Sequence, residues 1–379
     1  MRTRYLAVAL AMLALVGCGS PAPAIRHQAQ ARAATVKSAS GQLELIKQPE
    51  AGAAPLIALI DGAKQSIDFK IYMVTMSGPA REVVAALQRA ARRGVAVRAA
   101  IEAFPYQPEG NLRPGGFNAE AVKALLEAGA NVMYTRPNFK YSHEKSLVID
   151  GATAVVMTGN VTKSSFTTNR EFAVVDRRGR DVLTISRLFQ ADWVGETPLV
   201  PINPDIVVSP DNSRAQLTAL VAGAQKSLIV ESNSLQDASL LAMAGTRAKA
   251  GVDVKVLVPT ARNAGGDLKT WKKLRDAGIS QIRFLEAPYL HAKVIVADNA
   301  KAYIGSENLT ANSLDNNREL GLLLDDPAIV AEVLATNAED WKKGKPLEQP
   351  VTDPATPSPP ATGSQPISPI GPILPPLWD

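Results

Sequence analysis

The sequence has few of the residues that build metal sites, disulfides and nucleic-acid stacking surfaces. Its 379 residues include one cysteine and three histidines, and aromatic residues make up 5% of the chain. A single cysteine excludes an intramolecular disulfide, and the sequence holds no cluster of cysteine and histidine that would bind zinc. A basic face with interleaved aromatics, on which single-stranded nucleic acid stacks its bases, is not evident either. We therefore expect a protein that needs neither a metal nor a cofactor.

The chain also lacks a strong charge of either sign. Its 41 lysines and arginines stand against 36 aspartates and glutamates, which leaves a formal net charge of +5. This mild surplus favours anionic partners such as phosphate esters, nucleic acid or acidic lipid, without implying a nucleic-acid tract. Hydrophobic residues make up 46% of the sequence, enough for packed cores, and the length suits two halves of roughly 150 residues each.

The N-terminus carries the single cysteine at the end of an apolar run. Arg2 and Arg4 precede apolar residues that continue to Val16, and Cys18 follows. The run is too short to span a bilayer and is typical of a secretory signal. It resembles a bacterial lipoprotein signal, in which the cysteine becomes the lipidated first residue of the mature protein; a plain signal peptide is the alternative. We expect an exported protein that is anchored through Cys18 to a membrane of the bacterial cell envelope.

An internal duplication organises the rest of the chain. Two of the three histidines lie in the stretches 141–171 and 289–319, and five polar residues of the first stretch recur in the second at a constant offset of 148 residues. These pairs are His143 and His291, Lys145 and Lys293, Asp150 and Asp298, Asn160 and Asn308, and Glu171 and Glu319. The similarity extends upstream, where residues 56–67 resemble residues 217–228. Such a repeat indicates one site built from two half-sites.

The repeat and the composition divide the chain into six predicted segments. They are a signal peptide at 1–18, a flexible tether at 19–41, an N-terminal half at 42–195, a proline-rich linker at 196–210, a C-terminal half at 211–344, and a proline-rich tail at 345–379. The tether and the tail have little apolar periodicity, so we expect them to be extended and uncovered by any core. Because both motifs lie in one chain, we expect a monomer.

Apolar periodicity predicts alternating helices and strands in both halves. In the N-terminal half, helices are expected at 55–63, 79–92, 119–128 and 183–194, and strands at 66–75, 95–103, 145–149, 152–157 and 171–175. In the C-terminal half, helices are expected at 215–224, 240–250 and 268–277, strands at 227–231 and 253–258, and paired strands around Val294 and Ala302. This order indicates the α/β class, with each half a sandwich of a mixed β-sheet flanked by helices.

The duplicated motif predicts a site for a phosphodiester. In a strand, residues i and i+2 share a face, so each His-x-Lys motif presents an imidazole beside an ammonium group. Two imidazoles can act as nucleophile and general acid, while two lysines neutralise the non-bridging oxygens. Four further side chains are expected to donate hydrogen bonds to the same oxygens: Asn160, Asn308, Thr158 and Ser306.

The acidic residues of the motif have two expected roles. A nucleophilic imidazole needs one ring nitrogen free and the other held by an acceptor, which Glu171 and Glu319, each 28 residues after a histidine, can provide. Asp150 and Asp298 end their strands at turns. We interpret them as groups that support the catalytic set by fixing the loop and nearby hydrogen bonds, not as bases.

The pattern His-x-Lys-x4-Asp followed by Gly-Ser-x-Asn resembles the signature of the phospholipase D superfamily, the HKD phosphodiesterases. The second copy matches throughout, whereas the first has Met157 and Thr158 where Gly and Ser are usual. The resemblance spans roughly residues 42–341. It implies two fused α/β halves with pseudo-two-fold symmetry, an active site at their interface, a phosphohistidine intermediate and no obligatory metal. In many members the histidine of the first motif is the nucleophile, which implies that His143 attacks and His291 protonates the leaving alcohol; the reverse assignment stays open.

The motif indicates a reaction class and leaves the substrate open. Export and a lipid anchor favour a phospholipid, so we expect a phospholipase D-type phosphodiesterase that hydrolyses or transfers the phosphatidyl group. Three alternatives remain: a metal-independent endonuclease that cuts DNA, a phosphatidyltransferase similar to cardiolipin synthase, and an anchored binding module without catalysis. The intact His, Lys, Asn and Glu residues in both copies argue against the last.

Overall fold

The computed structural model describes residues 34–105, 115–196, 203–261 and 264–347. The predicted signal peptide with Cys18, most of the predicted tether and the tail from residue 348 lie outside the described residues. All described residues belong to one compact unit, which ends at Leu347. Within these ranges no helix combines the length and the apolar character needed to cross a membrane.

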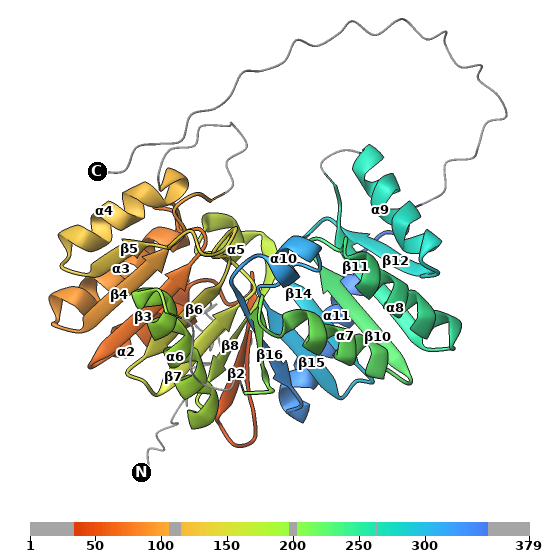
Figure 1. Ribbon diagram of the computed structural model, residues 1–379, viewed down its shortest axis with the longest axis horizontal. Coiled ribbons are helices and arrows are strands. Elements are labelled where there is room, and N and C mark those ends of the chain that lie inside the picture. The colour runs from red at the N-terminus through yellow and green to blue at the C-terminus, as the bar shows by residue number, and fades with distance from the viewer. Residues whose placement is uncertain (1–33, 106–114, 197–202, 262–263, 348–379) are drawn as a thin grey trace, which may run out of the picture. The chain divides into compact units, whose positions relative to one another are not determined.

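The N-terminal half is built on a mixed sheet with strand order β1-β2-β8-β7-β6-β3-β4-β5 (Figure 1). The neighbours β3, β4 and β5 are parallel, and the other pairs are antiparallel. The strands are β1 (Thr35–Lys37), β2 (Leu43–Gln48), β3 (Ser66–Ile71), β4 (Ala96–Ile101), β5 (Asn131–Tyr134), β6 (Lys145–Ile149), β7 (Thr153–Met157) and β8 (Asn169–Asp176). The helices are α2 (Ala54–Gly62), α3 (Pro79–Arg92), η1 (Gly116–Asn118), α4 (Ala119–Glu127), α5 (Lys163–Thr167) and α6 (Gly179–Val194).

The C-terminal half repeats this plan in a sheet with strand order β12-β11-β10-β14-β15-β16-β9. Its first three strands are parallel and the following pairs antiparallel. The strands are β9 (Ile206–Ser209), β10 (Ser227–Ser232), β11 (Asp253–Pro259), β12 (Gln281–Leu285), β13 (Tyr289–Leu290), β14 (Lys293–Ala297), β15 (Lys301–Gly305) and β16 (Glu319–Leu324). The helices are α7 (Ser213–Gly223), α8 (Ala238–Lys249), α9 (Ala264–Asp276), α10 (Ala311–Asp315) and α11 (Pro327–Lys343).

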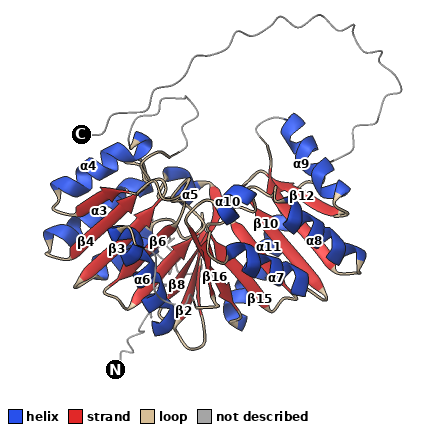
Figure 2. Ribbon diagram, viewed as in Figure 1, coloured by secondary structure: helices blue, strands red, loops and turns tan. Residues whose placement is uncertain are grey.

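Helices and sheets alternate in layers around three clusters of buried apolar residues (Figure 2). One cluster joins α2, α3 and α4 to the N-terminal sheet, and another joins α7 and α8 to the C-terminal sheet. The third contains residues of α6 and α11 together with strands of both sheets. Alternate residues of β6 serve different clusters, Leu147 the first and Val148 the shared one, as the two faces of a strand require. The predicted α/β fold with two similar halves is confirmed.

Several elements were not expected from the sequence. Strand β9 lies within the predicted linker 196–210, where it pairs with β16 at the edge of its sheet. Strand β1 likewise lies within the predicted tether and pairs with β2. Strands β2, β5, β12, β13 and β16 and helices η1, α5, α10 and α11 were also missed. Every residue of β16 is buried, so it lacks the alternation of apolar and polar residues that signals a strand.

Short backbone contacts connect the halves reciprocally. Strand β13 of the C-terminal half runs parallel to Asn169 and Arg170 at the start of β8. At the equivalent place, Ser142 of the N-terminal half forms a parallel bridge with Arg318. Such an exchange of equivalent contacts is what a two-fold relation between the halves produces.

Two buried ion pairs follow the same reciprocal pattern. Arg170 in β8 donates to Asp340 in α11 at 3.1 Å, and Arg318 donates to Asp192 in α6 at 3.0 Å. Both pairs cross from one half to the other, and both arginine side chains are almost fully buried. Each half therefore supplies the counter-ion that a buried cation of the other half requires.

Candidate active site

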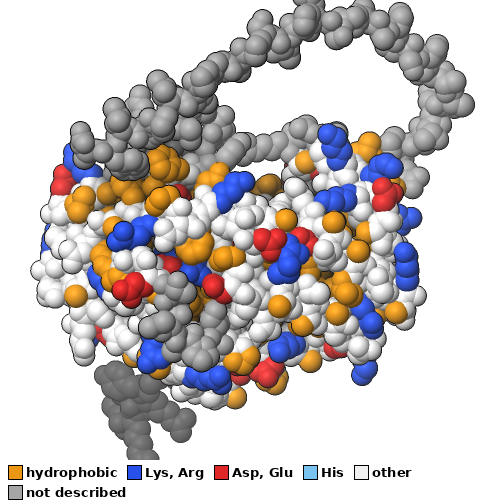
Figure 3. Space-filling view, in the orientation of Figure 1, with side chains coloured by type: hydrophobic (Ala, Val, Ile, Leu, Met, Phe, Trp, Pro, Cys, Tyr) orange, Lys and Arg blue, Asp and Glu red, His pale blue; other side chains and the backbone are white. Residues whose placement is uncertain are grey.

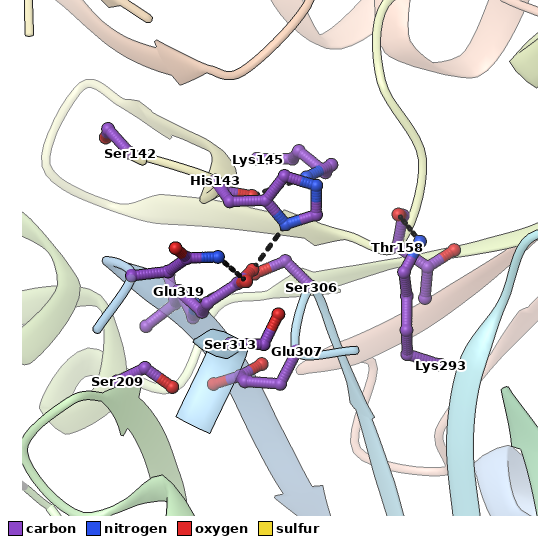
Figure 4. A network of polar contacts seen from close by, with 12 residues as sticks. Ser142, His143, Lys145, Thr158, Ser209, Lys293, Ser306, Glu307, Ser313 and Glu319 are labelled. Carbon is purple, nitrogen blue, oxygen red and sulfur yellow. Dashed lines mark hydrogen bonds and ion pairs between the residues drawn. The ribbon is translucent and has the colours of Figure 1, made fainter. Parts of the chain in front are cut away.

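The two His-x-Lys motifs meet where the halves face each other, and Figure 4 shows His143, Lys145 and Lys293 of this cluster. His143 lies two residues before Lys145, the first residue of β6, and His291 lies two residues before Lys293, the first residue of β14. Lys293 reaches into the other half, where its Nζ donates to the carbonyl of Thr158 at 3.1 Å. Both lysines are fully buried, whereas the side chains of His143 and His291 are 12% and 18% exposed to solvent. Each motif thus places a buried ammonium beside a partly exposed imidazole.

Each histidine is bonded to the glutamate of the opposite half. The Nδ1 atom of His143 lies 2.7 Å from Oε2 of Glu319, and Nδ1 of His291 lies 2.6 Å from Oε1 of Glu171. The backbone contacts between the halves cause this exchange, because pairing of β13 with β8 brings His291 alongside Glu171. The sequence predicted that these glutamates hold the histidines but did not indicate which glutamate serves which histidine.

Burial and charge set the protonation of these pairs. Burial alone would raise the pKa of Glu171, but His291 and Lys293 outweigh it and lower that pKa to about 2. Burial also lowers the pKa of His143 to about 4, despite the attraction of Glu319. An ionised carboxylate can only accept hydrogen bonds. The neutral imidazole must therefore donate the proton on Nδ1, and its lone pair lies on Nε2. This tautomer leaves Nε2 able to attack an electrophile.

The two lysines are cations held in an unfavourable environment. Burial lowers the pKa of Lys145 to about 7 and that of Lys293 to about 8, partly offset by nearby glutamates. An anion bound beside them would restore their charge, because opposite charges stabilise each other strongly where water is excluded. The site is therefore suited to bind an anionic group.

Thr158 and Ser306 have other partners than the predicted phosphate. The Thr158 hydroxyl donates to Glu171 at 2.7 Å and accepts from the backbone of Phe172 at 2.9 Å. The Ser306 hydroxyl accepts from the backbone of Leu320 at 3.0 Å. Both residues are fully buried. The Thr158 hydroxyl spends its proton on Glu171, so the prediction that it donates to the phosphate is corrected. The Ser306 hydroxyl only accepts in this bond, so its predicted donation to the phosphate stays a prediction.

Asn160 and Asn308 keep unused hydrogen-bonding capacity at the site. Their Oδ1 atoms are buried and have no hydrogen-bond partner within the described part of the chain. Asn160 also lines the groove that leads to His291. A buried polar atom without a partner costs free energy, so a ligand that satisfies it gains affinity. The prediction that these amides contact the substrate stays open to test.

Asp150 and Asp298 lie at the far ends of β6 and β14 from the lysines. Asp150 accepts from the backbone amides of three consecutive residues, 64–66, at 2.7 to 3.1 Å. Asp298 binds residues 225–227 in the same way. Both therefore fix a turn, as expected, but that turn is a full strand away from the histidines, so their inclusion in the catalytic set is corrected.

Some residues that shape the site were not predicted. Asn317 donates to Glu319 at 3.0 Å, and a Cβ atom at Gly159 would lie 2.8 Å from Cδ of Glu171. Asn317 recurs as Asn169, so the duplication carried a signal for it. Tyr72 packs edge-on against His143 with ring centroids 4.5 Å apart. The duplication gave no signal for Tyr72, because the equivalent residue is an asparagine.

No group of three His, Cys, Asp or Glu side chains suited to a metal ion occurs among the residues that the structure describes. The expectation that the site works without a metal stays a prediction.

The two-repeat fold and the paired sets of His, Lys and Glu define a protein of the phospholipase D superfamily. Residues 56–193 and 217–341 match the family described as "Cardiolipin synthase, PLD-like domain", and the chain belongs to this family. It is 25% identical to a cardiolipin synthase of Geobacillus kaustophilus over 76% of this chain and 63% of that protein. It is also 25% identical to cardiolipin synthase A of Serratia proteamaculans, over 80% of this chain and 72% of that protein. The chain thus spans less than two thirds of the Geobacillus protein.

Solved structures support the fold independently. A phosphatidylserine synthase from Haemophilus influenzae matches 85% of this chain and 91% of its own, with a TM-score of 0.62 and 13% identity. A polyphosphate kinase from Porphyromonas gingivalis matches 78% of this chain and 47% of its own, with a TM-score of 0.59 and 18% identity. At these identities the likeness concerns the fold alone.

Proposed function

We propose that this chain is a phospholipase D-type enzyme that transfers the phosphatidyl group of a phospholipid to an alcohol, or to water, through a phosphohistidine. The observation that carries the proposal is the pair of crossed His–Glu bonds beside two buried lysines. The proposal is supported by relatives that are named cardiolipin synthases, and for this reason we propose transfer before the hydrolysis that the sequence alone suggested first.

The geometry divides the reaction into two displacements at phosphorus. In the first, Nε2 of His143 attacks phosphorus, the bond from phosphorus to the leaving alcohol breaks, and the alcohol oxygen takes a proton from Nε2 of His291. In the second, the acceptor gives its hydroxyl proton to His291, its oxygen attacks phosphorus, and the bond from phosphorus to His143 breaks. Glu319 and Glu171 keep Nδ1 of each ring occupied, so both steps use Nε2.

The charge of the cluster supports this sequence of protonation states. Lys145 and Lys293 bring two positive charges, and Glu171 and Glu319 bring two negative charges. A phosphodiester adds one negative charge, which a single protonated imidazole balances. Burial lowers the pKa of His291, whereas a bound anion raises it, so substrate binding itself favours the protonated His291 that the leaving alcohol needs.

The face of the molecule shown in Figure 3 favours lipid over DNA. On the face shown in Figure 3, Lys and Arg side chains are interspersed with acidic and apolar ones instead of gathering in one basic patch. A nuclease needs a continuous basic track for the phosphate backbone. We further propose export and anchoring through a lipidated Cys18, which would hold the enzyme at the membrane that contains its substrate.

The test is to supply full-length protein with phosphatidylcholine or phosphatidylglycerol in the presence of ethanol, and to measure phosphatidylethanol and phosphatidic acid by mass spectrometry. The alcohol adduct is expected, because the intermediate must wait for a second nucleophile. His291→Ala protein is the control for background reaction. Nicking of plasmid DNA without any lipid product would keep the chemistry and reject the lipid substrate.

A further inference from the structure

Glu307 is a fully buried carboxyl of the second motif that the proposed mechanism leaves unused. Strands β15 and β16 are antiparallel, and their register, continued past the last ladder pair, places Glu307 opposite Glu319. Side chains directly opposite each other in such a pair lie close together on the same face. In the other half this spacing is so short that a Cβ atom at Gly159 would lie 2.8 Å from Cδ of Glu171. The carboxylate that holds His143 therefore has a second carboxyl as its neighbour (Figure 4).

Tyr303 reaches Glu307 across two glycines that are paired between β15 and β16. Its hydroxyl donates to Oε2 of Glu307 and accepts from the Glu307 backbone amide at 3.2 Å. A Cβ atom at Gly305 or at Gly321 would clash with the Tyr303 side chain, so the glycines make room for it. The N-terminal half has four different residues at the equivalent positions: Val155, Met157, Gly159 and Ala173. The tyrosine, the glutamate and both glycines thus form a unit that belongs to the second repeat alone.

The glutamates that hold the two histidines differ in their hydrogen bonds. Both accept from a histidine and from an asparagine. Glu171 also accepts from the Thr158 hydroxyl at 2.7 Å. The equivalent hydroxyl, on Ser306, accepts from a backbone amide and makes no bond to Glu319 in the described part of the chain. Glu319 therefore has one donor fewer than Glu171, and Glu307 is the side chain that lies opposite it.

The surroundings of Glu307 favour its protonated form. The ionisable groups that act with it are Glu319 on β16, Glu144 and Lys145 where β6 begins, and Tyr303 on β15. Burial, followed by the negative charge of Glu319, raises the pKa of the Glu307 carboxyl well above its usual value. Its Oε1 atom is buried and has no hydrogen-bond partner within the described ranges. A protonated carboxyl can donate a hydrogen bond, which a carboxylate cannot.

We propose that Glu307 is a neutral carboxylic acid that donates a hydrogen bond to Glu319, and that it is a positioning residue for His143. The inference rests on the proposed function and adds a residue to that site. Glu307 then does for Glu319 what the Thr158 hydroxyl does for Glu171. A donor to Glu319 spreads the negative charge that attracts a proton to His143, so the ring stays neutral and its Nε2 stays able to attack.

Infrared spectroscopy of the full-length protein tests where the proton lies. At pH 7 the wild type should show the C=O band of a protonated carboxyl, and Glu307→Gln should lose it. The matched control is Glu231→Gln, which removes another fully buried carboxyl, one whose pKa burial raises to about 7. The band lost in this control should be a different one, which fades in the wild type as pH rises through 7. If Glu307→Gln loses no such band, Glu307 is ionised and the inference is overturned.

The pKa of His143, measured by nitrogen-15 NMR titration, tests the effect on the ring. Glu307→Met removes the donor, so Glu319 should attract the proton more strongly. We expect the pKa of His143 to rise by about one unit, the tenfold effect of a hydrogen bond to a charged group. The acidic limb of the pH–rate profile should move equally. Glu307→Gln keeps an N–H donor and should restore the wild-type value, which Glu231→Gln should leave unchanged.

An unchanged His143 pKa in Glu307→Met would overturn the inference. If that variant does not fold, the infrared comparison still decides, because it needs only Glu307→Gln, which has nearly the same shape as the wild type. Neither spectroscopic measurement needs a substrate. Absence of lipid turnover in the wild type would therefore overturn the proposed function, while the spectra would judge the hydrogen bond separately.

Discussion

The imidazole of His143 is hydrogen-bonded to Glu319, a carboxylate 176 residues further along the chain, across a distance of 2.7 Å. The equivalent bond from His291 to Glu171 spans 120 residues and measures 2.6 Å. Each half supplies one His, one Lys and one Glu, but each histidine is bonded to the glutamate of the other half. The halves must therefore pack together before either ring acquires the tautomer that the chemistry needs.

The crossed pairs predict which ring each glutamate controls. Glu319→Gln should change the tautomer of His143 and leave that of His291 unaltered, because an amide can donate to Nδ1 where the carboxylate could not. Turnover should fall by roughly a hundred- to ten-thousand-fold, the usual worth of a positioned proton transfer. Nitrogen-15 NMR of the two rings measures the tautomers, and Glu171→Gln is the converse control. A shift of the His291 resonances in Glu319→Gln would refute the crossing.

The two histidines should act as one unit. His143→Ala and His291→Ala are each expected to abolish turnover, and the double variant should be no worse than either single one. With a donor whose leaving group needs no proton, His291→Ala should still form a phosphoryl adduct on His143, detectable by intact-protein mass spectrometry. The loss of a catalytic acid or base usually lowers activity by more than about tenfold. If either single variant kept more than about a tenth of wild-type activity, the two-histidine mechanism would be rejected.

The buried lysines predict a pH dependence of anion binding. Burial lowers the pKa values of Lys145 and Lys293 to about 7 and about 8, so without a bound anion they lose their charge as pH rises through that range. Sulfate affinity, measured by calorimetry, should fall between pH 6 and 9, and Lys145→Met should remove the part of the fall near pH 7. Constant affinity would show that the lysines stay charged.

The same lysines should make the free energy of unfolding depend on pH. Their pKa values in the folded protein lie below the unfolded value of about 10.5. Between the folded and unfolded pKa values, the folded protein therefore binds fewer protons than the unfolded chain. The contribution of the two lysines to the free energy of unfolding consequently rises with pH from about 7 to 10.5. Lys145→Met should flatten this rise in urea titrations.

The buried ion pair between Arg170 and Asp340 should matter for stability. Asp340→Asn leaves the fully buried guanidinium without its strongest partner, and we expect the free energy of unfolding to fall by about 3–5 kcal/mol. Chemical denaturation measures this loss. The control is Glu127→Gln, which removes the exposed pair with Lys123 and should change stability by less than about 0.5 kcal/mol. A loss for Asp340→Asn as small as that of the control would contradict the structural role.

Anchoring through Cys18 predicts a separable membrane attachment. Cys18→Ser should release the protein from the membrane fraction and leave it catalytically competent, because the folded unit that holds the site is described from Ala34 onward. Fractionation of an expressing bacterial host followed by a lipid assay measures both properties. Variant protein that stays on the membrane after cleavage of the signal would place the anchor elsewhere.

Local pattern and the duplication determined much of this protein. Helix α3 and strand β6 have the bounds that the sequence predicted. Helix α3 contrasts an apolar face with polar neighbours, whereas β6 is buried along its whole length and is bounded by the turn that begins at Asp150. The constant offset of 148 residues identified His143, Lys145 and their counterparts as one composite site, since only a shared function keeps five polar identities in register.

The tertiary structure alone decided the contacts that join distant segments. It paired each histidine with the glutamate of the opposite half. It also made an edge strand of β9 within a stretch that reads as a linker. These features depend on how two similar halves pack through a shared core. That packing brings together residues more than a hundred positions apart, and the local sequence around one residue does not indicate its partner.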